Sequence, residues 1–225
     1  MFIYKSLKRF FISVYDPFPF RRYTKKYQCI YIHIPKSAGT SILTALQNGR
    51  PHRDHANIKD YYRRDPARSE DYFKFSFVRN PYDRIASVFF YLQRGGNGGS
   101  NDLEIKYDML NRGIYNVNDF VNKFLDEEAC LQYVLLRTQY SFFVDDKGEF
   151  KMDFVGKYEN LEHDFLYVAD KIGLPIRKLP KLNMSDNQPL PHMGYIHHFN
   201  DISLRKINAL YLDDFEKFGY FKHHH

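Results

Sequence analysis

The sequence has no tryptophan, only two cysteines, and no apolar run long enough to cross a membrane. Two cysteines, Cys29 and Cys130, cannot build the disulfide framework of a small secreted protein, and both stand in apolar surroundings. We therefore expect reduced thiols in the core of a cytoplasmic protein. Residues 10–15 are apolar, but Asp16-Pro17 ends this run before it reaches the length of a signal peptide or a membrane span.

Composition favours one globular domain. The chain has 225 residues, 44% of them hydrophobic, which is enough for one sizeable core over residues 28–222. A net charge of +6 suits an anionic ligand but is too small to indicate nucleic acid. The three histidines at 223–225 look like the remnant of a purification tag.

Residues 1–27 form a basic and aromatic N-terminal extension. We expect its aromatic residues to pack on the domain and its lysines to stay solvated. Peripheral contact with a membrane surface is the alternative, because basic and aromatic side chains together suit a lipid interface.

Two stretches of the sequence each indicate a strand, a turn and a helix. In the first, Ile30, Ile32 and Ile34 share a strand face, and an apolar helix follows Thr40 and is capped by Gly49. In the second, phenylalanines alternate along residues 73–77, and Asn80-Pro81 opens a helix. Such units predict an α/β fold with a phosphate-loop-like arrangement, in which helices flank a mostly parallel central sheet in three layers.

The rest of the chain continues as helices and one strand without internal repeats. The predicted elements are a flexible loop at 94–101, a helix at 118–137, a turn at 146–148 followed by a strand, a helix at 160–172, an irregular loop at 179–200 and a helix at 201–217.

The turn "IPKSAGTS" has the chemistry of an anion site. A helix that starts at the carboxyl end of a parallel strand presents unpaired N–H groups and the positive end of its dipole. Gly39 permits close approach of a ligand, Thr40 and Ser41 add hydroxyl donors, and Lys36 adds a positive charge. A nucleotide triphosphatase loop places its lysine after the second glycine, whereas Lys36 precedes Gly39, so ATP and GTP chemistry are disfavoured.

A second anion site is expected where the second strand ends. Arg79 stands there, and Ser87 follows two turns into the next helix. A guanidinium fork and a hydroxyl donor can clamp a phosphate together. The alternative is structural: Arg79 pairs with Asp83, and Ser87 simply packs.

The segments "HIPKSAGTS" and "FKFSFVRNPYDRIASVFFY" together resemble the two motifs of carbohydrate sulfotransferases that use 3′-phosphoadenosine-5′-phosphosulfate (PAPS). The similarity is to the branch of the Golgi heparan and chondroitin sulfotransferases and their bacterial relatives. "DFVGKYENLEHDF" and "LYLDDFEKFGY" resemble later segments of that family, so the similarity spans residues 27–220. The Golgi enzymes of this family carry a membrane anchor, which we do not expect for this chain.

The resemblance implies roles for two groups of residues. The first motif would hold the phosphosulfate of PAPS, and the second would hold its 3′-phosphate. The residues concerned are Lys36, Ser37, Ala38, Gly39, Thr40 and Ser41 in the first motif, and Arg79 and Ser87 in the second. Lys36 would also stabilise the charge that develops on the leaving phosphate, and sulfuryl transfer needs no metal.

Transfer to a hydroxyl needs a general base, and histidine is suited to that role near neutral pH. By its place between the motifs, as in family members, we assign His55 as the base. His52 and Glu159 are the alternatives. His192, His197 and His198 stand in a proline-rich stretch without cysteines, so we expect surface positions or contact with an acidic substrate rather than a metal site.

We therefore expect a sulfotransferase that moves a sulfuryl group from PAPS to an acceptor hydroxyl, with a glycan as the expected acceptor and PAP, the desulfated nucleotide, as product. The alternatives are a kinase-like nucleotide-binding enzyme and a non-catalytic module that binds anions or membranes. The sequence leaves the acceptor and the oligomeric state open.

Overall fold

Two of the predicted strands, β1 (Cys29–Ile32) and β2 (Phe73–Val78), pair in parallel in the computed structural model of the chain, with Cys29 opposite Phe73. Every residue of β1 is buried, as is β2 from Lys74 onward. Strands covered on both faces read as continuous apolar runs, which explains these sequences. A third strand, β3 (Phe154–Lys157), completes the order β1-β2-β3.

The structure describes residues 17–49, 51, 53–175, 178–179 and 195–223. They divide into two units whose segments alternate along the chain. Unit 1 takes its described residues from Met1–Ile34, Ala38–Phe77 and Phe142–Asn183, and unit 2 from Pro35–Ser37, Val78–Ser141 and Met184–His225.

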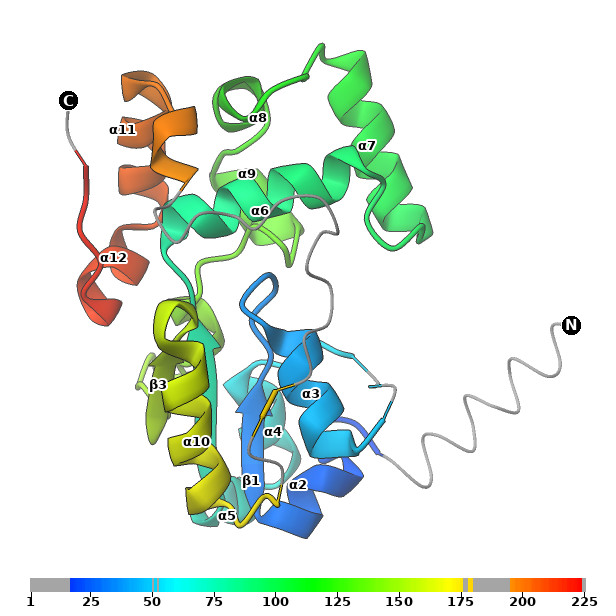
Figure 1. The fold of residues 1–225 in the computed structure, drawn as a ribbon, viewed down its shortest axis with the longest axis vertical. Helices are drawn as coiled ribbons and strands as arrows, with labels where there is room; N and C mark the ends of the chain where they lie inside the picture. Colours follow the sequence, from blue (N-terminus) through cyan, green and yellow to red (C-terminus); the bar gives the residue numbers. More distant parts are fainter. Residues whose placement is uncertain (1–16, 50, 52, 176–177, 180–194, 224–225) are drawn as a thin grey trace, which may run out of the picture. The chain divides into compact units, whose positions relative to one another are not determined.

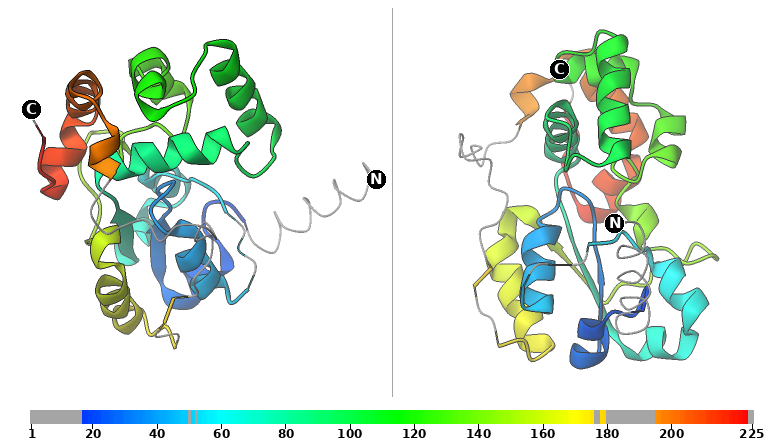
Figure 2. Two further views of the ribbon diagram at one scale, coloured as in Figure 1. Left: turned by 45° about the horizontal axis from the view of Figure 1, so that its top comes forward. Right: turned by 90° about the vertical axis from the view of Figure 1, so that its right-hand side faces the viewer.

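Unit 1 contains the sheet and the helices that cover it. Figures 1 and 2 show α3 and α10 on one face of the sheet and α4 and α5 on the other, which confirms the predicted three-layer α/β fold. The helices of unit 1 are α2 (Arg22–Tyr27), α3 (Gly39–Gln47), α4 (Ile58–Arg64), α5 (Pro66–Asp71) and α10 (Leu161–Lys171). Phe75 and Phe77 from β2 pack with apolar residues of α3 and α10 in one core.

Unit 2 is helical in its described residues. Its helices are α6 (Pro81–Gln93), α7 (Ser100–Asn111), α8 (Val117–Lys123), α9 (Glu127–Gln132), α11 (Asp201–Leu210) and α12 (Leu212–Phe218). The Asn80 side chain accepts a hydrogen bond from Tyr82 N at 3.0 Å, so the predicted start of α6 is confirmed. Apolar side chains of these helices form a second core, separate from that of unit 1.

Two predicted long helices are each broken in two, which corrects the sequence analysis. The helix expected at 118–137 becomes α8 and α9, because extended Asp126 uses its carboxylate to cap Ala129 N at 2.8 Å and starts a new helix. The helix expected at 201–217 is interrupted at Tyr211, whose hydroxyl donates to Leu136 O at 2.6 Å. Each break depends on contacts that periodicity does not record.

The end of α3 and the loop after α6 also depart from the expected details. Asn48, rather than Gly49, is the left-handed cap of α3, and its N–H donates to Thr44 O. The loop expected at 94–101 is shorter, because α7 already begins at Ser100. Gly95, Gly96 and Gly98 have positive φ in this loop, which only glycine adopts readily.

The described part of the N-terminal extension belongs to unit 1. Phe20 and Tyr23 are buried, and α2 lies within the range assigned to the extension. Residues 1–16, and the greater part of the irregular loop expected at 179–200, lie outside the described residues. Among the helices that are described, none is both long and apolar enough to cross a membrane.

Candidate functional site

The first motif joins β1 to α3 through an unusual backbone. Lys36 and Ala38 have left-handed φ values of 68° and 62°, although neither is glycine. Such residues cost roughly 1–3 kcal/mol each and cluster at functional sites. Ala38 is the N-cap of α3 and offers no side-chain acceptor, and the first turn of the helix has no acidic residue. A helix start of this kind is chemically suited to an anion.

In unit 2, the side chain of Lys36 lies against an aromatic ring. Its Nζ is 4.2 Å from the ring centroid of Tyr91, a cation–π contact. The Tyr91 hydroxyl donates to Asp102 Oδ2 at 2.7 Å, and the same oxygen accepts from Asn97 N in the glycine-rich loop. The lysine thus lies beside a ring that is itself fixed to that loop, a contact that the sequence analysis did not anticipate.

The two motifs meet within unit 2. Arg79 Nη1 donates to Lys36 O at 3.4 Å, and Arg79 is 7% exposed. Lys36 of the first motif and Arg79 of the second motif are therefore neighbours within one unit. Ser87 lies farther along α6 and is half-buried.

A buried glutamine holds the backbone of Arg79. Gln139 Oε1 accepts from Arg79 N at 2.9 Å, and Gln139 Nε2 donates to Arg79 O at 2.9 Å. The hydroxyl of Ser37, which is fully buried, points to the same Oε1 at 3.5 Å. Ser37 is thus directed into the protein, so its side chain supports the loop from behind.

Gln139 is oriented in turn by a buried carboxylate. Asp214 of α12 accepts from Gln139 N at 2.9 Å, from Gln139 Nε2 at 3.3 Å and from Tyr140 N at 2.9 Å. Burial raises the pKa of Asp214, while the positive charge of Arg84 and these hydrogen bonds oppose the rise. Sequence reasoning missed both residues: Gln139 stands in no motif, and Asp214 lies in the quoted segment "LYLDDFEKFGY" without a role being assigned to it.

In unit 1, the candidate base His55 lies in the segment that leads into α4. Its Nδ1 is 3.0 Å from His33 O. The preceding residue, Asp54, pairs through Oδ2 with Arg21 Nη2 at 2.7 Å and Nε at 2.9 Å. Burial lowers the pKa of His55, so the imidazole is neutral at pH 7 and is able to accept a proton.

Gly39 and Thr40 have neighbours that the sequence did not suggest. A Cβ on Gly39 would lie 1.9 Å from His33 Cδ2, so the glycine admits the ring of His33. Arg53 Nη1 donates to Thr40 Oγ1 at 3.4 Å on the surface. The next residue, Ser41, is only 9% exposed.

The alternative bases are placed differently. Glu159 is exposed in the 3₁₀ turn Tyr158–Asn160 that follows β3. His52 lies outside the described residues. Both therefore remain sequence-based alternatives to His55.

The other histidines do not build a metal site in the described part of the chain. His197 and His198 are exposed in the 3₁₀ turn Tyr195–His198, as the sequence predicted. His192 lies outside the described residues. Within the described ranges, no group of three or more His, Cys, Asp or Glu side chains is arranged to hold a metal ion.

Comparison with known proteins identifies the family. The model of a family described as "Sulfotransferase family" matches residues 21–221, which is nearly the whole chain. An uncharacterised protein of Archaeoglobus fulgidus is 30% identical over 106 residues, covering 47% of this chain and 72% of its own length. No solved structure matches.

Proposed function

The chain belongs to the sulfotransferase family, and from this premise we propose that it transfers a sulfuryl group from PAPS to a hydroxyl of a glycan. The observation that carries the proposal is the contact between Lys36 and Arg79, which joins one cationic residue from each motif. A ligand with phosphates on both sides of its ribose needs two such cations.

The residues of the first motif fit the phosphosulfate of PAPS. The start of α3 has no side-chain cap and no acidic residue in its first turn, so its N–H groups suit a negatively charged ligand. Bound PAPS supplies the sulfuryl group. Lys36, whose ammonium lies over the ring of Tyr91, would neutralise charge on the 5′-phosphate.

The second motif supplies the selectivity for the 3′-phosphate. The side chain of Gln139 hydrogen-bonds to both the backbone N–H and the backbone carbonyl of Arg79. Because this backbone is already fixed, less conformational freedom is lost when the guanidinium binds a phosphate. Ser87 adds a hydroxyl donor from α6.

His55 accepts the proton of the acceptor hydroxyl. Its Nδ1 lies on a carbonyl oxygen, which cannot donate, so Nδ1 carries the hydrogen and Nε2 keeps the lone pair. The lowered pKa keeps this lone pair free at neutral pH. His55 is therefore in the protonation state that a general base requires.

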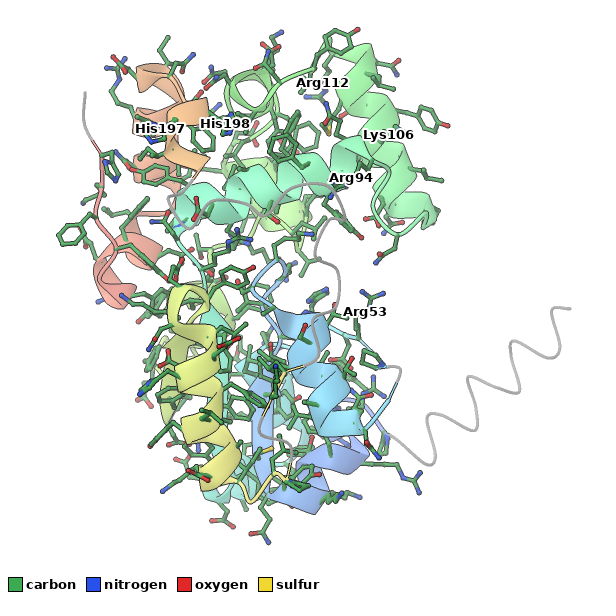
Figure 3. All side chains as sticks on the ribbon, viewed as in Figure 1. Arg53, Arg94, Lys106, Arg112, His197 and His198 are labelled. Atoms are coloured by element: carbon green, nitrogen blue, oxygen red, sulfur yellow. The ribbon has the colours of Figure 1, made fainter. Side chains whose placement is uncertain are left out.

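Basic side chains beside the glycine-rich loop favour an acidic acceptor. Arg94 is exposed at the start of this loop, and Lys106 Nζ would lie 4.0 Å from a Cβ on Gly95. Figure 3 labels both residues in unit 2, together with Arg112, the C-cap of α7. We infer that this surface attracts the carboxylates or sulfates of a polysaccharide.

Transfer can be tested with radiolabelled PAPS and a panel of acidic and neutral polysaccharides. We expect label in the acidic polymers, and we expect His55→Ala to lower the rate by roughly 10²–10⁴-fold. His163→Ala is the matched control, because His163 is 81% exposed on α10 of the same unit. Magnesium-dependent transfer from labelled ATP, with none from PAPS, would overturn the proposal.

A further inference from the structure

In unit 1, the side chains of His33 and His55 each hydrogen-bond to a backbone carbonyl in the other's segment. His33 Nδ1 lies 2.9 Å from Asp54 O, and His55 Nδ1 lies 3.0 Å from His33 O. Each ring is thus bonded to the backbone of the segment that carries the other ring. Because carbonyl oxygens only accept, both Nδ1 atoms carry hydrogen and both Nε2 atoms keep their lone pairs.

The two rings are also in contact. Their centroids are 4.4 Å apart with an interplanar angle of 31°, and His33 is 7% exposed. Burial, followed by the proximity of His55, lowers the pKa of His33 to about 3. A neutral His33 at pH 7 adds no charge beside the candidate base.

The charged groups around the pair act in opposite directions. Arg53 lowers the pKa of both histidines, whereas the Asp54 carboxylate raises that of His55. Arg21 holds this carboxylate through two hydrogen bonds. Desolvation outweighs the carboxylate, so both rings stay neutral near pH 7.

His33 is fixed on its other side as well. It follows β1 directly in the chain, and its ring lies so close to Gly39 that a Cβ there would be 2.0 Å from Nε2. The ring is therefore wedged between the start of α3 and the segment that carries His55. The contact with Gly39 therefore keeps the ring of His33 against the segment that carries His55.

We propose that His33 is a positioning residue for the reaction, which holds His55 in the tautomer whose free Nε2 accepts the proton. The proposal rests on the proposed function in one respect, because it takes His55 as the base. It adds a role for the histidine at the start of "HIPKSAGTS", separate from the binding of the donor. His33 acts through two backbone carbonyls and one ring contact.

Two substitutions separate the parts of this role. His33→Asn can keep a donor in the position of Nδ1 but loses the ring contact with His55. His33→Phe keeps a ring of similar size but has no donor for Asp54 O. The matched control is His163→Asn, which removes an exposed histidine from the same unit.

The first measurement is the tautomer of His55 by nitrogen-15 NMR of the imidazole at pH 7, which does not depend on activity. We expect the Nδ1–H form in the wild type and in the control. His33→Phe keeps the carbonyl of residue 33 but loses the bond to Asp54 O, which holds the His55 segment beside that carbonyl, so we expect a mixture of tautomers in this variant. The second is the pH dependence of kcat. His33→Phe should lower kcat by roughly 10-fold to 100-fold with KM for PAPS unchanged, and His33→Asn should recover part of the loss.

The acid limb of the kcat profile provides a readout that a purely structural role would not move. His33→Asn removes buried surface next to His55, so the pKa of His55 should rise toward its ordinary value and the limb should move to higher pH. A folded His33→Phe enzyme with wild-type kcat and an unchanged His55 tautomer would overturn the proposal. Full activity of His55→Ala would instead refute the base assignment, while the NMR result would still report on the two hydrogen bonds.

Discussion

Replacement of Gly39 by alanine should destabilise the protein through one identifiable collision. The new Cβ would lie 1.9 Å from His33 Cδ2, where ordinary van der Waals contacts are 3.4–4 Å. The ring must retreat by about 1.5 Å to relieve this contact. A shift of that size breaks the 2.9 Å hydrogen bond from His33 Nδ1 to Asp54 O.

The magnitude follows from three contributions. Overpacking costs about 1–3 kcal/mol. The lost hydrogen bond costs about 1 kcal/mol. Alanine in place of glycine in a helix returns about 0.5–1 kcal/mol, since Gly39 is the first residue of α3. We therefore expect Gly39→Ala to lower the free energy of unfolding by about 1–3.5 kcal/mol.

Urea denaturation of a double-mutant cycle with His33→Ala measures this coupling. Once the ring is absent, Gly39→Ala should be neutral or stabilising by up to about 1 kcal/mol. Gly99→Ala serves as the control, because Gly99 has a φ of −71° and a Cβ there meets nothing within 4 Å. An equal cost of Gly39→Ala in both backgrounds would refute the collision.

Three further predictions concern the donor site and the histidines. Arg79→Ala should weaken the binding of PAP far more than that of AMP, measured by calorimetry, and equal losses would contradict a 3′-phosphate clamp. Gln139→Ala removes the side-chain hydrogen bonds to Arg79 N and O and the one to Asp214 Oδ2, which leaves the buried N–H of Arg79 unsatisfied, so it should lower the free energy of unfolding by about 2–4 kcal/mol and weaken PAP binding; wild-type values for both would exclude this support. The pKa values of His33 and His55 are lowered on folding, so the unfolded chain binds protons first as the pH falls. Stability should therefore fall as the pH drops below ~6.5, by about 1.4 kcal/mol per pH unit from His33, whose folded-state pKa is about 3, and His55 should add to the loss; denaturation of His33→Asn should show a smaller slope.

The parallel strands and the helix starts could be predicted because their signals are local. Alternating phenylalanines define β2, and Asn80-Pro81 marks the start of α6 within a few residues. The breaks at Asp126 and Tyr211 could not be predicted from periodicity. The apolar pattern continues through both positions. The first break coincides with the cap that Asp126 places on Ala129 N, and the second coincides with the hydrogen bond from Tyr211 to the distant carbonyl of Leu136.

The supporting residues of the site were hidden for a similar reason. Gln139 is 60 residues from Arg79 and 75 from Asp214 along the chain, and a lone glutamine carries no motif. His33 stands in an alternating stretch with isoleucines, where it reads as one more strand residue. Its partner Asp54 is 21 residues away, so only the folded chain reveals the exchange of hydrogen bonds with His55.

The central claim is that the two motifs bind a nucleotide with both a 5′ and a 3′ anion, and a titration of PAP, ADP, AMP and ATP tests it most directly. We expect PAP to bind most tightly and, at ~100 times its dissociation constant, to raise the free energy of unfolding by about 2.7 kcal/mol. Lys36→Ala and Arg79→Ala should each weaken this binding, whereas Lys25→Ala, at an exposed position on α2, should not. Binding of ATP or ADP as tight as that of PAP, or no binding of PAP, would contradict the account.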